Sequence, residues 1–179
     1  MNFIKTDIEG LVIIETKKYF DERGYFFEVF QHQKFNEFLG KEIKFVQENE
    51  SMSSLNVIRG LHFQKPPFAQ GKLVRVPYGK VIDVAVDIRT NSNTYGKTFS
   101  IELSQENGKQ LWIPEGFAHG FVSLEKNSLL SYKCTNYYNQ PSEDSILWNS
   151  IDLDWNVENP IVSNKDQIAK DFSIFVSSF

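Results

Sequence analysis

The feature that most constrains the fold of this chain is a strict alternation of apolar and polar side chains over residues 80–88. In an extended segment, four branched apolar residues share one face and two aspartates share the other: Ile82, Val84, Val86 and Ile88 against Asp83 and Asp87. Residues 97–103 repeat the alternation, and residues 91–96 between them are rich in turn formers. The pattern predicts a β-hairpin.

Further short apolar runs, punctuated by glycines, continue this pattern along the chain. They lie at residues 11–16, 25–30, 57–63, 72–77, 110–113, 117–124 and 128–135. Aromatic residues make up 15% of the chain, and such rigid side chains favour the pleated surface of a sheet. Many short strands with regular turn signals predict an all-β fold, a double-stranded β-helix jelly roll.

A few short helices complete the predicted fold. Residues 33–39 fit two helical turns ended by Gly40, and residues 165–172 fit two more behind an Asn164 cap. The 179 residues contain no repeat, low-complexity tract or linker. We therefore expect one domain spanning residues 1–179.

Charge and cysteine content narrow the classes of function. The net charge is -4, and no stripe of Lys or Arg is present to bind a phosphate backbone, so a nucleic-acid partner is not expected. Cys134 is the single cysteine, and the early apolar run at residues 11–14 is too short for a secretory or membrane-spanning segment. We expect a cytoplasmic protein that does not enter a membrane.

Several titratable side chains fall within the predicted strands or close to them. They are Arg59, His62, Lys72, His119, Tyr132 and Lys165. Any one of them alone is well explained as a hydrogen-bonded core residue. Together they are costly among apolar neighbours unless a ligand or a reaction uses them, so the set predicts a functional site inside the jelly roll.

Metal and covalent chemistry are poorly matched by the sequence. A metal-binding cupin normally supplies two histidines one residue apart, with a carboxylate nearby, whereas this chain has His62 alone in Leu-His-Phe-Gln. Nothing around Cys134 is electropositive, and a lone cysteine is commonly a small buried apolar residue. No glycine-rich phosphate loop opens a helix. We expect neither a metal nor another cofactor.

Six motifs in order along the chain resemble one family. They are FVQEN at 45–49, RGLHFQ at 59–64, QGKLVRV at 70–76, DVAVDIR at 83–89, WIPEGFAHGF at 112–121 and YKCT at 132–135. In register from about residue 10 to Asp166, these segments resemble the dTDP-4-dehydrorhamnose 3,5-epimerases. The resemblance implies a metal-free, cupin-like jelly roll that forms a homodimer and epimerises a nucleotide-linked 4-keto-6-deoxy sugar.

The same resemblance implies catalytic roles. It makes His62 the general base, Asp166 its orienting carboxylate and Tyr132 the general acid. Removal of a proton next to a ketone needs a base that titrates near neutral pH, which imidazole does, and a carboxylate partner fixes its tautomer. The resulting enolate needs a donor at the C4 oxygen, for which Lys72, with His119 beside it, is the candidate.

Binding roles follow from the resemblance as well. Arg59 and Lys165 are expected to hold the diphosphate, which suits the planar fork of an arginine, and Tyr138 and Glu143 to lie near the sugar nucleotide. Strict alternation from His62 would turn Arg59 to the opposite face. Either Gly60 marks a bulge that redirects the strand, which we favour, or Arg59 is structural.

An exchanged N-terminal strand is implied to complete each active site of the homodimer. It is expected to carry substrate-binding residues from the partner: Arg23, Glu28, Gln47 and Asn49. Glu48 stands where the family usually has aspartate, and it is expected to face the nucleotide and to alter contacts with the base.

Other functions remain open from the sequence. Relatives of the same mechanism include a C3-only epimerase, a 3,4-ketoisomerase and an epimerase of a GDP-linked 4-keto-heptose. The presence of both His62 and Tyr132 argues against the ketoisomerase. A noncatalytic sugar-binding cupin would need pocket aromatics but no base and acid, so the set of His62, Asp166 and Tyr132 disfavours it.

Overall fold

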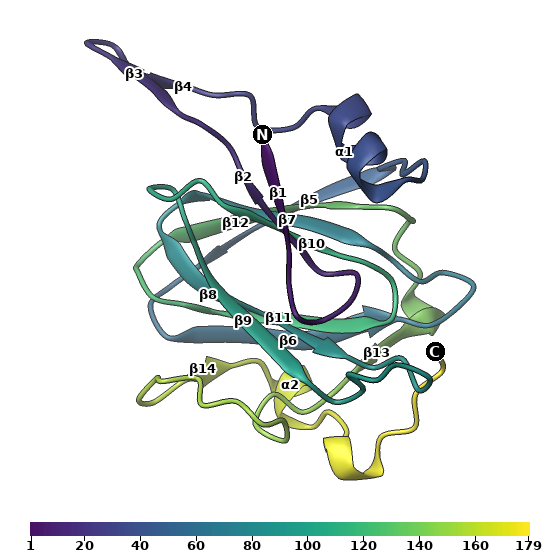
Figure 1. The fold of residues 1–179 in the computed structure, drawn as a ribbon. Coiled ribbons are helices and arrows are strands. Elements are labelled where there is room, and N and C mark those ends of the chain that lie inside the picture. Colours follow the sequence, from purple (N-terminus) through teal and green to yellow (C-terminus); the bar gives the residue numbers. More distant parts are fainter.

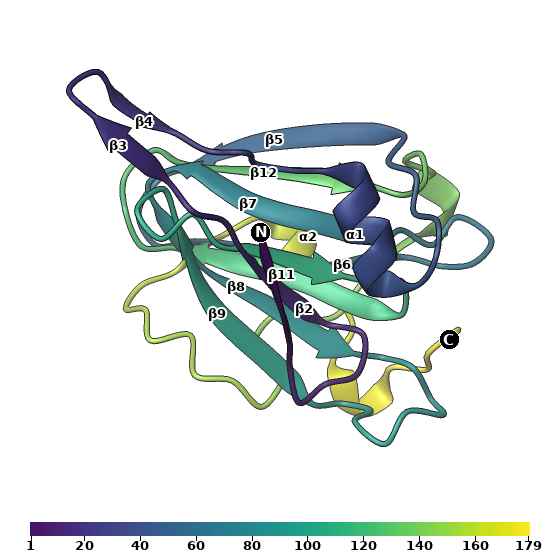
Figure 2. The same cartoon turned by 45° about the horizontal axis from the view of Figure 1, so that its top comes forward.

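The computed structural model describes residues 1–179 as two facing β-sheets, a projecting hairpin and two short α-helices (Figures 1 and 2). The first sheet has the strand order β1-β2-β10-β7-β12-β5. Its strands are β1 (Asn2–Lys5), β2 (Val12–Glu15), β10 (Gln110–Ile113), β7 (Lys72–Tyr78), β12 (Ser128–Cys134) and β5 (Gln47–Ser53).

The second sheet has the order β13-β6-β11-β8-β9, and β14 pairs with β6. Its strands are β13 (Glu143–Ser145), β6 (Val57–Gln64), β11 (Phe117–Ser123), β8 (Lys80–Asp87), β9 (Thr98–Ser104) and β14 (Ile161–Val162). From β6 to β12 the chain crosses repeatedly between the two sheets, as it does in a jelly roll.

The predicted hairpin is confirmed as the antiparallel pair of β8 and β9, which pair from Lys80 with Ser104 to Val86 with Thr98. Both faces of β8 are buried. Val81 and Ala85 face the core between the sheets, whereas Val84 and Val86 belong to a second apolar cluster with Trp155 and Phe175. The C-terminal segment therefore covers the outer face of the second sheet, as Figure 1 shows.

Helix α1 (His32–Leu39) covers the outer face of the first sheet. Its Phe35 is fully buried and meets Trp112 edge to face, with ring centroids 5.3 Å apart. The predicted stop at Gly40 is confirmed, because this residue has a left-handed φ of 66° that glycine adopts without strain. This apolar cover holds β7, and with it Lys72, firmly in place.

Two predicted elements differ from the structure. Helix α2 (Asn164–Gln167) is capped by Ser163, one residue before the expected cap, and the chain turns away after it because Ile168 is not helical. Of the predicted strand at residues 25–30, only β4 (Gly24–Phe26) forms, and it pairs with β3 (Tyr19–Asp21). This hairpin projects from the barrel with Phe20 and Phe26 each 74% exposed (Figure 1).

None of the helices is both long enough and apolar enough to cross a membrane.

Candidate active site

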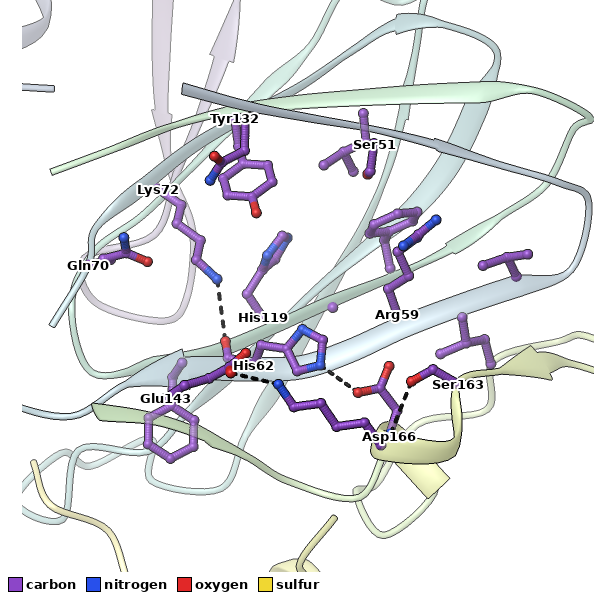
Figure 3. A pocket seen from close by; sticks show the side chains of 18 of the residues that line it. Ser51, Arg59, His62, Gln70, Lys72, His119, Tyr132, Glu143, Ser163 and Asp166 are labelled. Carbon is purple, nitrogen blue, oxygen red and sulfur yellow. Dashed lines mark hydrogen bonds and ion pairs between the residues drawn. The ribbon is translucent and has the colours of Figure 1, made fainter. Parts of the chain in front are cut away.

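A cavity of about 550 Å³ opens between the two sheets and carries most of the predicted site residues (Figure 3). The predicted residues that line it are Gln47, Asn49, Arg59, His62, Lys72, His119, Tyr132, Tyr138, Glu143, Lys165 and Asp166. These come from strands of both sheets, from α2 and, for Tyr138, from the segment that follows β12, so residues far apart in the sequence meet at one opening.

His62 and Asp166 form the closest polar contact in this cavity. Nε2 of His62 lies 2.5 Å from Oδ1 of Asp166, and the His62 side chain is 32% exposed whereas that of Asp166 is 4% exposed. Burial raises the pKa of Asp166, but the hydrogen bond and charge of His62 and further hydrogen bonds, including that from the Gly60 N–H, bring it below its usual range. Asp166 therefore stays ionised, and Nδ1 of His62 is left free.

The predicted bulge at Gly60 is present in β6. His62 pairs with His119 and Arg59 pairs with Phe121, so two residues of β6 lie opposite one residue of β11. Gly60 has a φ of +121°, and a Cβ there would lie 2.6 Å from the Cα of Gly120, which leaves room only for glycine. The bulge turns both Arg59 and His62 into the cavity.

Lys72 extends from β7 to the base of the cavity, where it is 9% exposed. Its Nζ donates to the carbonyl oxygen of His62 at 3.4 Å and lies 5.8 Å from the centre of the Tyr132 ring, and it forms no ion pair. Burial lowers the pKa of Lys72, and Cys134, followed by Asp83 and Glu143, works against this shift. The ammonium group has donors to spare for a ligand.

Tyr132 faces His62 from the other sheet. It lies on β12, with its hydroxyl directed into the space above His62 and Lys72 (Figure 3). Burial is the main reason that the pKa of Tyr132 is raised, while Asn49 and Arg59 oppose the shift. The phenol is therefore protonated at neutral pH and can donate a proton across the cavity from the imidazole.

His119 is paired with an aspartate that the sequence did not single out. Its Nε2 lies 2.8 Å from Oδ1 of Asp83, and the side chains are 7% and 0% exposed. Phe121 is the strand partner of Asp83, so Asp83 and His119 are diagonal neighbours on the inner face of the second sheet. The signal in the sequence is an acidic residue within an otherwise apolar strand.

The outer part of the cavity carries a small charged network. Oε2 of Glu143 lies 2.6 Å from Nζ of Lys165, and the Tyr138 hydroxyl donates to the same oxygen at 3.1 Å. Burial raises the pKa of Glu143, but the hydrogen bonds from Lys165 and Tyr138 hold it below its usual value. Arg59 donates from Nε to Oγ of Ser53 at 3.1 Å and from Nη2 to the carbonyl oxygen of Met52 at 3.0 Å, which leaves Nη1 without a protein partner.

Gln47 and Asn49 do not need a partner subunit to reach this cavity, which corrects the sequence-based expectation. Both lie on β5, which pairs with β12 of the same chain and directs alternate residues inward. Glu48 lies between them and therefore points to the outer face, where Oε2 is 2.8 Å from Nζ of Lys133. The expectation that Glu48 faces the nucleotide is therefore wrong for this register of β5.

Arg23 and Glu28 also lie outside the cavity. Arg23 is in the turn of the projecting hairpin, where Nη2 is 2.5 Å from Oδ2 of Asp21. Glu28 follows the hairpin, and its Oε1 is 3.4 Å from Nζ of Lys34. Neither residue lines the cavity of its own chain.

The chemistry of the cavity is that of protons and charges. No three side chains among His, Cys, Asp and Glu come together to hold a metal ion. Cys134 is fully buried beside Lys72, and burial raises the pKa of its thiol, which disfavours the reactive thiolate. A base with its carboxylate, a protonated phenol and a buried ammonium group instead surround one space.

Comparison with known proteins agrees with this arrangement. A family model described as dTDP-4-dehydrorhamnose 3,5-epimerase matches residues 5–173. The chain belongs to this family. The resemblance inferred from the six sequence motifs is thereby confirmed.

Individual members of the epimerase family match along nearly their whole length. The dTDP-4-dehydrorhamnose 3,5-epimerase of Shigella flexneri is 51% identical over 168 residues, which cover 93% of each chain. The crystal structure of the Elizabethkingia anophelis enzyme of that name has a TM-score of 0.92 at 47% identity and covers 97% of each chain.

A third relative was solved with a ligand. The dTDP-6-deoxy-D-glucose-3,5-epimerase of Legionella pneumophila, in complex with dTDP-4-keto-L-rhamnose, has a TM-score of 0.93 at 47% identity. The match covers 98% of this chain and 94% of that one. These neighbours confirm the predicted all-β, cupin-like jelly roll.

Proposed function

We propose that this protein converts dTDP-4-dehydro-6-deoxy-D-glucose to dTDP-4-dehydro-L-rhamnose by epimerisation at C3 and C5. The observation that carries the proposal is that His62, held by Asp166, and Tyr132 face one cavity from opposite sheets, with Lys72 at its base. Family membership agrees with the same reaction.

The first step is removal of the proton at C3 or C5. Nδ1 of His62 takes the proton, the electrons of the broken C–H bond form a carbon–carbon double bond with C4, and those of the C4 carbonyl move to its oxygen. Asp166 stabilises the imidazolium. Lys72 donates to the enolate oxygen, and a positioned donor of this kind stabilises the transition state by about 3 kcal/mol.

The second step returns a proton from the other face of the planar enolate. Tyr132 gives its hydroxyl proton to the carbon, the double bond moves back to the C4 oxygen, and the configuration at that carbon inverts. Exchange of protons with water then restores neutral His62 and protonated Tyr132. Two rounds, one at each carbon, complete the conversion without a redox change or a cofactor.

The nucleotide half of the substrate is held at the mouth of the cavity. We assign Arg59 and Lys165 to the diphosphate, because both carry charge at the opening and arginine binds two phosphate oxygens at once. Diphosphate binding would take Lys165 from Glu143. Tyr138, at 56% exposure, offers an aromatic surface for the base.

A homodimer would complete this site. The projecting β3–β4 hairpin exposes aromatic side chains and carries Arg23 away from its own cavity, with Glu28 just beyond it. We assign these two residues to the substrate of a neighbouring subunit, reached when the hairpin docks on that subunit. Sedimentation should give a dimer at assay concentrations, and a fully active monomer would contradict this assignment.

One labelling experiment tests the function. In deuterated water with dTDP-4-keto-6-deoxyglucose, NMR should locate deuterium at both C3 and C5 of the product, with and without a chelator. GDP-linked 4-keto sugars serve as the matched control and should exchange far more slowly. Label at C3 alone would identify a C3 epimerase, and no label at either carbon would contradict the proposed reaction.

A further inference from the structure

Asp83 is a fully buried carboxylate with one oxygen that has no hydrogen-bond partner. Oδ1 contacts Nε2 of His119 at 2.8 Å, whereas Oδ2 is enclosed and unpartnered. A charged oxygen without a donor in the protein interior is costly, and such groups are uncommon in folded proteins. The position of Asp83 behind His119, which lines the cavity, therefore calls for an explanation.

The same strand shows what a structural carboxylate looks like. Asp87 lies four residues further along β8 and is also fully buried. Its carboxylate accepts hydrogen bonds from Arg89, Ser92 and Thr94, at 2.6 to 2.7 Å for the closest contact with each. The strand can thus bury a carboxylate with its bonds satisfied, and Asp83 differs because its single partner is His119, which lines the cavity.

The contact with Asp83 determines which nitrogen of His119 carries the proton. An ionised carboxylate only accepts hydrogen bonds, so Nε2 of His119 must be protonated. Burial, followed by the charges of Lys72 and His62, outweighs Asp83 and lowers the pKa of His119. The ring is therefore neutral, and its Nδ1, which has no protein partner and is not among the enclosed atoms, presents a lone pair to the cavity.

We propose that Asp83 is a positioning residue of the epimerase reaction: it fixes the ring of His119 as an acceptor for a sugar hydroxyl. The effect of Asp83 on catalysis rests on the proposed function, but the position of the proton on the His119 ring is a property of the protein without substrate. The sequence predicts His119 as a hydrogen-bond donor to the enolate oxygen. The proposal makes it instead an acceptor of a hydrogen bond from a sugar hydroxyl. Lys72 then supplies the donor.

The protonation of His119 can be measured without substrate. In wild-type protein labelled with ¹⁵N-histidine, NMR at neutral pH should show the His119 ring protonated at Nε2 and unprotonated at Nδ1. Loss of the signals in His119→Gln assigns them. A proton on Nδ1 would overturn the proposal, and a failure of the protein to epimerise any sugar would leave this result intact while it contradicts the proposed function.

The role of Asp83 is tested with Asp83→Asn, with Asp87→Asn as the matched control. Asp83→Asn should lower kcat about 10- to 100-fold, as loss of the carboxylate behind a functional imidazole does at metal sites. The ¹⁵N signals of its His119 ring should show a population protonated at Nδ1, because an amide, unlike a carboxylate, can also donate a hydrogen bond to Nε2. Asp87→Asn should keep the wild-type ring signals. An unchanged His119 tautomer in folded Asp83→Asn would overturn the proposal, and the wild-type NMR measurement decides the tautomer even if that variant does not fold.

Discussion

The two histidine–aspartate pairs of the cavity are held in different ways. His119 and Asp83 lie on neighbouring strands of one sheet and are almost fully buried, whereas His62 is 32% exposed and its partner comes from the four-residue helix α2. Strand pairing fixes the first pair in one orientation. Both imidazoles leave Nδ1 free, but only the more exposed His62 can readily exchange protons with water, which a group that must take and release protons requires.

Breaking the accessible pair at its imidazole should have the largest effect. His62→Asn removes the base, and an amide cannot accept the proton, so solvent exchange at both C3 and C5 should fall by about 10⁴-fold. Binding of dTDP should persist, because Arg59 and Lys165 are unchanged. Deuterium incorporation followed by NMR gives the rate, and substantial exchange at either carbon would mean that another group is the base.

The carboxylates of the two pairs should differ in importance. Asp166→Asn should lower kcat by about 10²- to 10⁴-fold, since the amide no longer holds the imidazole in the correct tautomer or stabilises its charge. We expect a smaller loss for Asp83→Asn, because Asp83 acts on groups that position the sugar rather than on the base. Steady-state kinetics of the two variants rank them, and the reverse order would contradict the division of roles.

Asp87 is a buried carboxylate outside the two histidine–aspartate pairs and serves as their control. Its replacement should lower the stability of the fold rather than the turnover number. Burial favours a raised pKa, but the hydrogen bonds from Arg89, Ser92 and Thr94 lower that of Asp87 from 3.8 to about 2. Its stabilising contribution is therefore present above the higher value and is lost as the pH falls through the lower one.

Asp87→Asn should thus lower the free energy of unfolding by about 2 kcal/mol at neutral pH, the range for hydrogen bonds to a charged group. The difference from wild type should shrink as the pH falls toward 2. Denaturant unfolding across this pH range measures it. A difference that stays constant at low pH would show that the carboxylate charge is not responsible.

The sequence predicts best those elements whose conformation is determined by residues close together in the chain. The β8–β9 hairpin follows from alternation with a turn between, and the end of α1 follows from Gly40. The bulge at Gly60 could be predicted because the family resemblance placed Arg59 and His62 at one site, whereas strict alternation would have put them on opposite faces. In each case the deciding residues lie within a few positions of one another.

The missed features depend on contacts that alternation does not specify. Alternation places Asp83 on one face of β8 and Val84 and Val86 on the other. It does not say which face lies between the two sheets, because the C-terminal segment buries the face of Val84 and Val86 as well. Strand β5 is polar on both faces, so it gave no apolar signal, and Gln47 was assigned to the partner subunit. Asp83 was missed because its partner, His119, lies 36 residues away.

The measurement that tests the account most directly uses Tyr132→Phe, which removes one hydroxyl and keeps the aromatic ring. With the dTDP-linked 4-keto sugar in deuterated water, His62 should still take protons and return deuterium to the same face, so NMR should show exchange with retained configuration. Inversion should fall by about 10²- to 10⁴-fold, most strongly at C5. Inversion of both centres at the wild-type rate would contradict the assignment of acid and base to opposite walls of the cavity.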